Sequence, residues 1–309
     1  MTAAARQPVE PHSDAKRGMT GTEGPARAPR TVPDAVEVYA LGSNPDESAR
    51  LQRQSDELRP EAAALLERLA LLPGQSAIDL GCGPRGIIDL LSSAVSPGGR
   101  VVGLDADPQH VAMAAEYARQ SGLGNVQAVA ADARHTGLPS DSFDLVHART
   151  LLVTIPEPAA VISEMVRLAK PGGWVASQEP DIEHRLCYPP LPAWDRLGEI
   201  FQASFSRAGA DLFIGRRLTE LYREAGLAEI GVTAHASTYP AGHSRRTILP
   251  DLARSLHSTI LELGLASERE LSDLDQAVRE HLADPRTVAI GHLLFVAWGR
   301  KPTGPPHAN

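Results

Sequence analysis

The stretch Ala77-Ile-Asp-Leu-Gly-Cys-Gly-Pro-Arg-Gly86 decides the fold of this 309-residue chain. It reads as a short buried strand that ends in a carboxylate, followed by a glycine-rich turn and the start of a helix. Gly81, Gly83 and Gly86 have the spacing G-x-G-x-x-G. Because glycine has no Cβ, such a turn can bring backbone N–H groups and a helix N-terminus close to a ligand. Dinucleotide-binding enzymes share this spacing, so the loop alone does not identify the ligand.

Four further apolar strands are predicted after this loop, and polar residues stand where the strands end. The strands lie near residues 100–105, 125–130, 143–149 and 174–179, and they alternate with helices near 86–95, 108–121 and 157–169. This alternation predicts an α/β fold with a doubly wound parallel sheet that carries helices on both faces. Ligands bind outside the carboxyl ends of such strands. The polar residues at those ends are Asp79, Asp105, Asp132, Arg149 and Glu179.

Five motifs in this order resemble the class I S-adenosylmethionine (SAM) methyltransferases, and more narrowly their small-molecule branch, which includes the quinone-biosynthesis C-methyltransferases. The motifs are Asp79-Leu-Gly-Cys-Gly83, Gly103-Leu-Asp105, Ala131-Asp132, Leu138-Pro-Ser-Asp-Ser-Phe-Asp144 and Leu168-Ala-Lys-Pro-Gly-Gly173. The resemblance covers residues 36–180 well and is weaker after that. It implies a Rossmann-like, mostly parallel sheet of seven strands, with SAM as cofactor and S-adenosylhomocysteine as product.

The resemblance also implies where the nucleoside part of SAM would bind. Asp105 would accept hydrogen bonds from both ribose hydroxyls, next to Ala106, and its alternative role is to cap the helix that follows. Asp107 fits that capping role better. Asp132 would accept from the adenine amino group, with the Ala133 N–H near the ring, and its alternative role is that of a turn aspartate.

The rest of the implied cofactor site comprises Asp79, Gly81, Gly83, Arg149 and Tyr39. Arg149 follows the fourth strand, where relatives contact the methionine part of SAM. Tyr39 belongs to a segment that closes over SAM in similar enzymes, and ordinary packing is its alternative role. His147, in contrast, is predicted to be a hydrogen-bonded core residue rather than a catalytic one. Arg85 stands where many relatives have a small residue, and its side chain either extends to solvent or reaches a substrate anion.

Four polar residues after the fifth strand form the candidate catalytic cluster: Glu179, Asp181, His184 and Arg185. Glu179 could serve as a general base if it reaches a substrate proton within hydrogen-bonding distance, and His184 is the second candidate. The alternative for Glu179 is a cap or an ion pair with Arg185. No metal-binding residues are predicted, and a metal site built on cysteine is disfavoured because Cys82 and Cys187 are the only cysteines.

The chain is predicted to fall into five parts. Residues 1–33 form a disordered tail, 34–72 an N-terminal helical lid, 73–182 the SAM-binding core, 183–300 the rest of the core with a substrate cap, and 301–309 a loose tail. The cap consists of two insertions, 183–212 and 240–285, because segments inserted after the carboxyl edge of a sheet usually carry specificity. In this region helices are predicted at 194–207, 214–225, 249–263 and 268–282, and strands at 230–237 and 288–298.

Several basic side chains of the C-terminal third are candidates for substrate binding. His235 and the run His243-Ser-Arg-Arg246 could face the cleft, and the run could hold an acidic or phosphorylated substrate. An exposed loop is the commoner explanation for such a run. An isoprenoid diphosphate would be supported if Arg185, Arg216 or Arg245 lined the cleft.

The composition disfavours several classes of partner. A formal net charge of −8 and an isoelectric point near 5.8 argue against nucleic acid or an anionic membrane surface held by bulk charge. No apolar stretch approaches the length of a membrane span, and the first residues lack the apolar core of a signal peptide. We therefore expect a soluble cytoplasmic protein, with a homodimer as the default assembly.

These observations predict a SAM-dependent methyltransferase that acts on a small, fairly apolar natural product or secondary metabolite, through O-, C- or N-methylation. A methyl sulfonium mainly needs alignment with the nucleophile, exclusion of water and, where required, removal of a proton. The alternative is a SAM-binding enzyme of the same fold that catalyses a rearrangement or cyclisation without methyl transfer. A nucleic-acid methyltransferase is disfavoured, because the chain is acidic and has Ala148-Arg-Thr-Leu-Leu152 in place of an Asn-Pro-Pro-Tyr-like motif.

Overall fold

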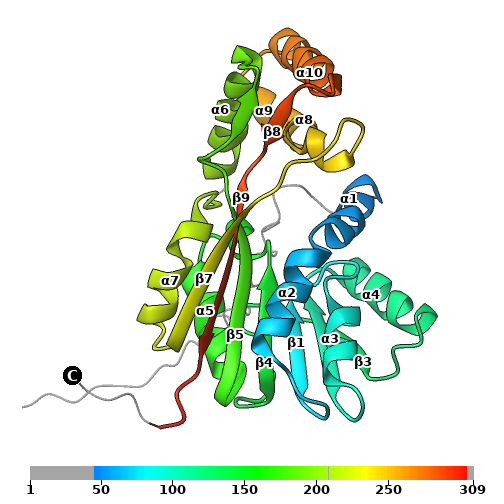
Figure 1. Ribbon diagram of the computed structural model, residues 1–309, viewed down its shortest axis with the longest axis vertical. Helices are drawn as coiled ribbons and strands as arrows, with labels where there is room; N and C mark the ends of the chain where they lie inside the picture. The colour runs from blue at the N-terminus through cyan, green and yellow to red at the C-terminus, as the bar shows by residue number, and fades with distance from the viewer. Residues whose placement is uncertain (1–44, 208, 305–309) are drawn as a thin grey trace, which may run out of the picture. The chain divides into compact units, whose positions relative to one another are not determined.

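A seven-stranded sheet forms the core of the chain, for which the computed structural model describes residues 45–207 and 209–304 (Figure 1). The strands lie in the order β3-β2-β1-β4-β5-β9-β7. They are β1 (Ser76–Leu80), β2 (Arg100–Asp105), β3 (Val126–Ala130), β4 (Phe143–Arg149), β5 (Ala169–Asp181), β7 (Ala228–Ala236) and β9 (Leu293–Arg300). Neighbouring pairs from β3 to β5 are parallel, whereas β9 runs antiparallel to both β5 and β7. The predicted α/β fold with a mostly parallel sheet of seven strands is confirmed.

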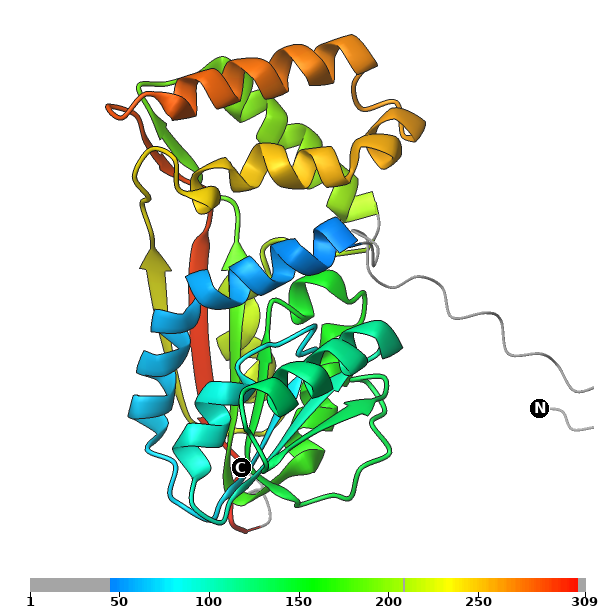
Figure 2. The same cartoon turned by 90° about the vertical axis from the view of Figure 1, so that its right-hand side faces the viewer.

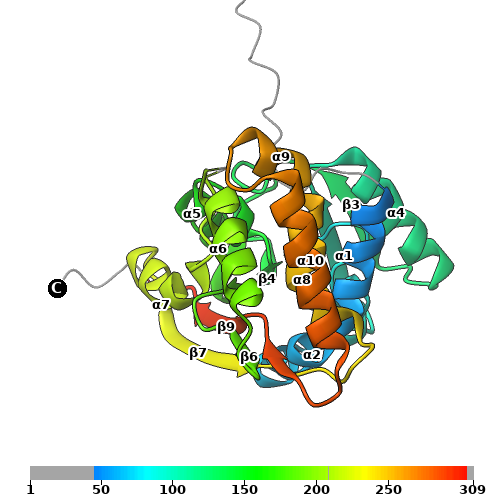
Figure 3. The same cartoon turned by 90° about the horizontal axis from the view of Figure 1, so that it is seen from above.

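Helices cover both faces of this sheet (Figure 3). On one face lie α2 (Arg59–Leu69), α3 (Ile88–Val95) and α4 (Pro108–Gln120), and on the other α5 (Pro158–Leu168) and α7 (Ile214–Glu224). Side chains alternate along each strand, so Ala77 and Leu145 pack with the first group of helices and Ile78 and Val146 with the second. None of the helices in the described parts of the chain has both the length and the apolar character of a membrane span.

The strand order reverses at β1, and this reversal places the functional edge of the sheet. The chain runs from β1 outward to β2 and β3 and then returns to β4 on the other side of β1. The ends of β1 and β4 lie side by side, with Asp79 next to His147 in the register. Ligands of open α/β sheets bind outside the carboxyl ends of the strands at such a reversal.

Two parts of the chain lie beyond the carboxyl ends of the strands (Figure 2). The first is α1 (Pro45–Glu57), which is the beginning of the described part of the predicted lid; the predicted tail over 1–33 lies outside the described residues. The second, here called the cap, comprises α6 (Pro192–Arg207), η2 (Ser244–Thr247), α8 (Ile248–Ser255), α9 (His257–Glu262), α10 (Glu268–Ala283) and the ribbon of β6 (Leu186–Tyr188) and β8 (Val288–Ile290). Helix α6 packs against α8, α9 and α10, so the two predicted insertions build one body.

Two elements of the C-terminal third differ from the prediction. The helix predicted over 249–263 is divided at Leu256, whose backbone (φ −95°, ψ 10°) ends α8 and begins α9. The strand predicted over 288–298 is divided at Gly291-His292, because β8 pairs with β6 while β9 pairs with β5 and β7. The apolar pattern of one segment does not show that its two halves have different partners.

The chain stays attached to the core beyond β9. Lys301 Nζ donates to Asp141 Oδ1 at 2.7 Å and to the Ala169 carbonyl at 2.9 Å. Its own carbonyl accepts from the Gly172 N–H at 2.7 Å. Ordered contacts therefore continue past the start of the tail predicted at 301, and residues 305–309 lie outside the described residues.

Candidate functional site

The glycine loop between β1 and α3 is shaped by positive backbone angles and by a buried carboxylate beneath it. Gly81, Gly83 and Gly86 have φ values of +64°, +57° and +55°, a region that residues with a Cβ seldom adopt. A Cβ at Gly86 would lie 2.1 Å from Asp79 Oδ2, and this oxygen accepts from the Ile87 N–H at 2.9 Å. The Asp79 residue is only 2% exposed. This buried carboxylate therefore fixes the shape of the loop through its bond with the Ile87 N–H.

The second oxygen of Asp79 connects the loop to the neighbouring strands. His147 Nδ1 donates to Asp79 Oδ1 at 2.7 Å, and His147 Nε2 lies 3.2 Å from Gln178 Oε1. All three side chains are buried. Because a carboxylate only accepts hydrogen bonds, Asp79 places a proton on Nδ1 of the imidazole. His147 has the position predicted for it, a hydrogen-bonded residue of the core, while Gln178 is a member of this row that sequence reasoning missed.

Asp105, at the end of β2, faces the same loop. Its Oδ2 accepts from the Gly83 N–H at 2.8 Å and its Oδ1 from the Asp107 N–H at 2.9 Å. Asp107 itself caps α4 by accepting from the Gln109 N–H at 2.8 Å, as predicted. The side chain of Asp105 is 14% exposed, and each carboxylate oxygen can accept more than one hydrogen bond, so acceptor capacity is left at the strand end. Ala106 beside it is exposed.

His110 is a polar neighbour of Asp105 that sequence reasoning missed. It is buried on the first turn of α4, with Nδ1 3.5 Å from Asp105 Oδ1. Asp105 raises the pKa of this imidazole, mainly through hydrogen bonding. The opposite ring nitrogen, Nε2, is buried and has no hydrogen-bond partner among the described residues. The signal in the sequence is its place three residues after the N-cap Asp107, since side chains of a first turn point back towards the helix start.

Asp132 follows β3 and is held by its own turn. Arg134 donates to Oδ1 from its backbone N–H (2.8 Å) and from Nε (3.0 Å), and to Oδ2 from Nη2 (2.6 Å). These bonds lower the pKa of the Asp132 carboxyl. The side chain stays 44% exposed, while Ala133 is buried. The turn-aspartate role, which was the alternative prediction, is therefore present, and adenine binding by Asp132 and Ala133 stays a prediction.

Arg149 lies beneath the glycine loop. It is 8% exposed and donates to the carbonyls of Gly86 (3.4 Å) and Leu58 (3.3 Å). Burial lowers its pKa to about 10. Because Leu58 joins α1 to α2, Arg149 connects β4 both with the loop and with the junction of these two helices. Tyr39, the other lid residue predicted at the site, lies outside the described residues.

Helix α1 contacts this edge of the sheet through polar side chains. Gln54 Nε2 donates to Thr150 Oγ1, directly after β4, at 3.0 Å. Asp56 accepts from Arg85 of the glycine loop at 2.7 Å, and the Arg85 guanidinium lies 4.6 Å from the centre of the Tyr117 ring. Arg85 thus pairs with α1, a partner that neither prediction for it included.

Glu179, at the end of β5, is a completely buried cap. Its Oε1 accepts from the N–H groups of Leu151 (3.1 Å) and Leu152 (3.0 Å), and its Oε2 from that of Val153 (3.2 Å). These bonds hold the short 3-10 helix η1 (Leu152–Thr154), which follows β4. Burial raises the pKa of Glu179 to about 7, although the three N–H donors act in the opposite direction. The cap that was the alternative prediction is therefore present.

The other members of the predicted catalytic cluster have different surroundings. Arg185 donates to a backbone carbonyl of its own turn at 3.1 Å, and the predicted ion pair with Glu179 is not among its interactions. Asp181 is fully buried and pairs with Arg216. His184 is exposed in the turn between β5 and β6. Glu179 and Asp181 are thus buried, whereas His184 lies in an exposed turn, so the four residues do not form one cluster. The catalytic roles of Glu179 and His184 stay predictions.

The pair Arg245-Arg246 in η2 is buried, so the prediction of an exposed loop is wrong. The two residues are 5% and 6% exposed. Arg246 donates to the backbone carbonyls of Tyr239, Leu282, Asp284 and Thr287. These carbonyls come from segments that meet only in the folded cap. A run of basic residues resembles a solvent-facing loop when its acceptors are distant in the sequence.

The side chains of residues 45–207 and 209–304 include no group of three or more His, Cys, Asp or Glu that could hold a metal ion. Both cysteines are free thiols. Burial raises the pKa of the Cys82 thiol well above its ordinary value, so this group of the glycine loop is protonated at neutral pH. The chemistry available at the loop is therefore that of backbone N–H groups, carboxylates and imidazoles.

Comparison with known proteins gives concordant matches. The sequence model of one family, described as Methyltransferase domain, matches residues 71–226. The chain is 28% identical over 191 residues to the demethylmenaquinone methyltransferase of Geobacillus kaustophilus, which covers 58% of this chain and 82% of the relative. It is 37% identical over 123 residues to the nocamycin O-methyltransferase of Saccharothrix syringae, which covers 40% of this chain and 44% of that enzyme.

A solved structure shares the fold. The phosphoethanolamine N-methyltransferase 2 of Haemonchus contortus, in complex with phosphomonomethylethanolamine and S-adenosylhomocysteine, matches with a TM-score of 0.53 and 22% sequence identity. The match covers 79% of this chain and 52% of that chain. The likeness extends the agreement from motifs to the three-dimensional arrangement of the elements.

Proposed function

We propose that this chain, which belongs to the methyltransferase-domain family, transfers a methyl group from SAM to a small, fairly apolar natural product. The observation that carries the proposal is the glycine loop, which is held between the carboxylates of Asp79 and Asp105 where the strand order reverses. The Gly83 and Ile87 N–H groups donate to these carboxylates and fix the loop, and because its glycines have no Cβ a ligand can approach the backbone closely. The predicted membership of the methyltransferases is confirmed by the family match.

The residues at the loop fit SAM. A Cβ built on Gly83 would meet only one atom, Leu51 Cδ1 at 3.9 Å, so the loop has room on this side. Beside Asp105, the buried Nε2 of His110 has no partner among the described residues, and a polar ligand atom or a water bound with it would satisfy this nitrogen. When bound, SAM supplies a methyl group on a positively charged sulfur that an aligned nucleophile can attack.

Each part of SAM has a proposed partner in this arrangement. The cofactor would lie against Gly81, Gly83, Asp105, Ala106, Asp132 and Ala133. Asp105 would accept the ribose hydroxyls through its remaining lone pairs. Asp79 and Arg149 are buried beneath the loop, and we assign them the role of positioning residues that hold its shape. The predicted contact of Tyr39 with the cofactor stays a prediction, because Tyr39 lies outside the described residues.

The cap supports a small-molecule acceptor. Two relatives are named for demethylmenaquinone and for nocamycin, which are small molecules. The cap consists of two insertions that come together beyond the strand ends, where segments that carry specificity are usually found. For proton removal, the exposed His184 is the more accessible of the two predicted bases, because both oxygens of Glu179 already accept backbone hydrogen bonds.

The test starts with binding and continues with turnover. Isothermal titration calorimetry should show that the full chain binds SAM and S-adenosylhomocysteine, and binding of neither would overturn the proposal. The protein is then incubated with methyl-labelled SAM and a small-molecule extract of its source cells. We expect one labelled metabolite together with an equal amount of S-adenosylhomocysteine. A product that forms without S-adenosylhomocysteine would support the rearrangement or cyclisation alternative instead.

A further inference from the structure

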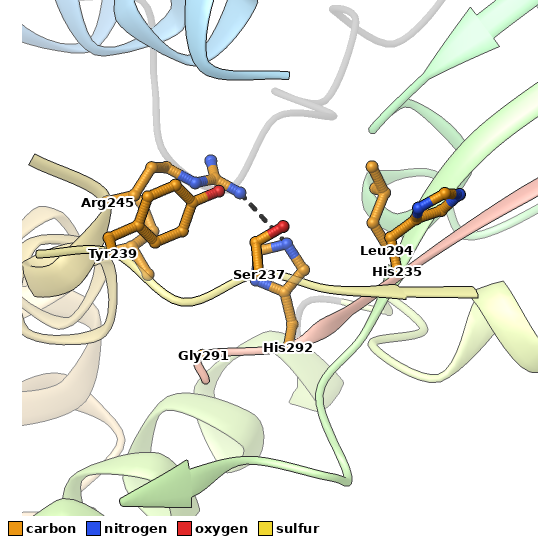
Figure 4. Close-up of a pocket in the computed structure, with 8 residues that line it drawn as sticks. His235, Ser237, Tyr239, Arg245, Gly291, His292 and Leu294 are labelled. Carbon is orange, nitrogen blue, oxygen red and sulfur yellow. Dashed lines mark hydrogen bonds between the residues drawn. The ribbon is translucent and has the colours of Figure 1, made fainter. Parts of the chain in front are cut away.

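A small pocket lies where the sheet meets the cap (Figure 4). Its walls come from the end of β7, the segment that follows it, η2, α8 and the junction of β8 and β9. The lining residues are His235, Ser237, Tyr239, Arg245, Ile248, Gly291, His292 and Leu294. The cavity has a volume of about 20 Å³, enough for a water molecule or for a small polar group of a ligand. None of these eight residues carries a carboxylate.

Arg245 is the charged group of this pocket, and its hydrogen bonding is incomplete. The residue is 5% exposed. Its Nη2 donates to His292 Nε2 at 3.1 Å, and Figure 4 shows the guanidinium and the imidazole facing each other. Its Nε is buried and makes no hydrogen bond among the described residues. Glu57 Oε2 of α1 lies 3.6 Å from this nitrogen, close enough for an ion pair but too far for a good hydrogen bond.

The other side chains that line the pocket around Arg245 carry no negative charge. Burial, together with the Arg245 cation, lowers the pKa of His292 to about 3. The imidazole is therefore neutral at physiological pH, and its Nε2 accepts from Arg245. Tyr239 stacks on His243, with ring centres 4.6 Å apart. Tyr239 and Ser237 add two neutral hydroxyl groups to the lining.

We propose that this pocket binds a carboxylate group of the acceptor substrate, with Arg245 as its counter-ion. The Arg245 Nε makes no hydrogen bond among the described residues, and the Glu57 carboxylate 3.6 Å away lies outside the lining. Such a guanidinium, next to two hydroxyl groups, is suited to an anion with two acceptor oxygens. The inference rests on the proposed function, because it assigns the acceptor of the same methyl transfer. It narrows that acceptor to an apolar molecule that carries an acid group.

The other arginines predicted to bind a diphosphate lie outside the pocket, so a single negative charge is expected there. Of the three residues predicted to bind a diphosphate, Arg216 is occupied by Asp181 and Glu183, and Arg185 donates to a backbone carbonyl. Only Arg245 of these three lines the pocket. One guanidinium and a cavity of about 20 Å³ match a carboxylate in charge and size better than a diphosphate.

The test uses two probes of equal shape that differ in charge, 4-fluorobenzoate and its neutral amide, 4-fluorobenzamide. Each is titrated with the full chain, saturated with S-adenosylhomocysteine, and followed by fluorine NMR. We expect the wild type to bind the benzoate at least tenfold more tightly than the benzamide. Equal affinities would overturn the proposal, and this comparison does not depend on the folding of any variant.

Variants then locate the binding. Arg245→Gln should weaken binding of 4-fluorobenzoate at least tenfold and leave binding of 4-fluorobenzamide unchanged. Arg254→Gln is the matched control. Arg254 is exposed on α8, so this substitution removes the same charge outside the pocket. Equal benzoate affinity of the Arg245→Gln variant and the control would overturn the proposal. Affinity for S-adenosylhomocysteine, measured alone, separates this result from a failure of the proposed function.

Discussion

The glycine-loop edge of the sheet and the junction with the cap differ in how their buried charged side chains are hydrogen-bonded. At the loop edge, the oxygens of Asp79 and Glu179 accept from backbone N–H groups or from His147. At the junction, Arg245 is similarly buried, yet its Nε has no hydrogen bond among the described residues. A buried donor without a partner costs free energy, which an arriving acceptor recovers. The loop edge is thus held in shape by its own hydrogen bonds, while the junction has a donor for the carboxylate that we propose as its ligand.

The largest effect is expected from Gly86→Ala, which breaks the loop edge. Alanine would have to adopt a φ of +55° with its Cβ 2.1 Å from Asp79 Oδ2. We expect the free energy of unfolding to fall by about 3–5 kcal/mol and SAM binding to be lost. Urea denaturation and calorimetry measure the two quantities.

Gly122→Ala is the matched control for this variant. Gly122 also has a positive φ, +66°, but a Cβ there would meet no atom within 4 Å. Only the backbone cost of about 1–2 kcal/mol is expected, with normal SAM binding. Equal losses of stability in the two variants would mean that the contact with Asp79 does not shape the loop.

The second largest effect is expected from Glu179→Gln, which tests whether the carboxylate is a cap or a base. The amide nitrogen would face a backbone N–H, so two donors would oppose each other inside the core. We expect a loss of about 2–3 kcal/mol in urea denaturation, and a kcat per folded molecule within a few-fold of wild type. Glu220→Gln, exposed on α7, is the control and should change stability by less than about 0.5 kcal/mol. A stable Glu179→Gln variant with kcat reduced a hundredfold would identify a general base instead.

A smaller effect is expected from Asp105→Asn, which sharpens the comparison by removing charge from the cofactor edge. Hydrogen bonds to a charged acceptor are about twice as strong as neutral ones, so the Kd for SAM should rise about 10- to 30-fold. Asp107→Asn is the control, because asparagine caps a helix as well as aspartate does. Calorimetry that shows the same weakening for both variants would remove the ribose-binding role of Asp105.

The smallest effect concerns the pH dependence of stability. Lowering the pH should change the free energy of unfolding in opposite directions through Glu179 at the loop edge and His292 at the junction. Burial raises the pKa of Glu179 from 4.5 to about 7, so its contribution to stability is present below pH 4.5 and is lost as the pH rises through 7. Burial and Arg245 lower the pKa of His292 from 6.5 to about 3, so its contribution is present above pH 6.5 and is lost as the pH falls.

Between pH 6.5 and 5.5 each group therefore changes the free energy of unfolding by about 1 kcal/mol, in opposite directions. Relative to wild type, Glu179→Gln should lose about this amount of stability when the pH is lowered over the interval, and His292→Gln should gain it. Urea denaturation at the two pH values measures both changes. Changes of the same sign in the two variants would contradict the assignment.

The sequence by itself determined the features whose causes are local. Strand β1 and the glycine loop were predicted from a run of ten residues, 77–86, and α3 from the residues directly after it, because apolar periodicity and positive φ angles at glycine belong to adjacent residues. The N-cap of α4 by Asp107 was predicted for the same reason. The strand ends then brought Asp79, Asp105 and Arg149 to one edge, since parallel strands end on the same side of a sheet.

Only the tertiary structure decided which partners the buried charges have. The carbonyl acceptors of Arg246 lie between 7 and 41 residues away in the chain. The two arginines of a run that reads as an exposed loop are therefore buried. The cap role of Glu179 and the division of the last strand at Gly291 have the same origin, and so does the lack of a hydrogen-bond partner for His110 Nε2 among the described residues. A buried polar group must be satisfied by whatever the whole fold brings within hydrogen-bonding distance, and the order of residues along one segment does not contain that information.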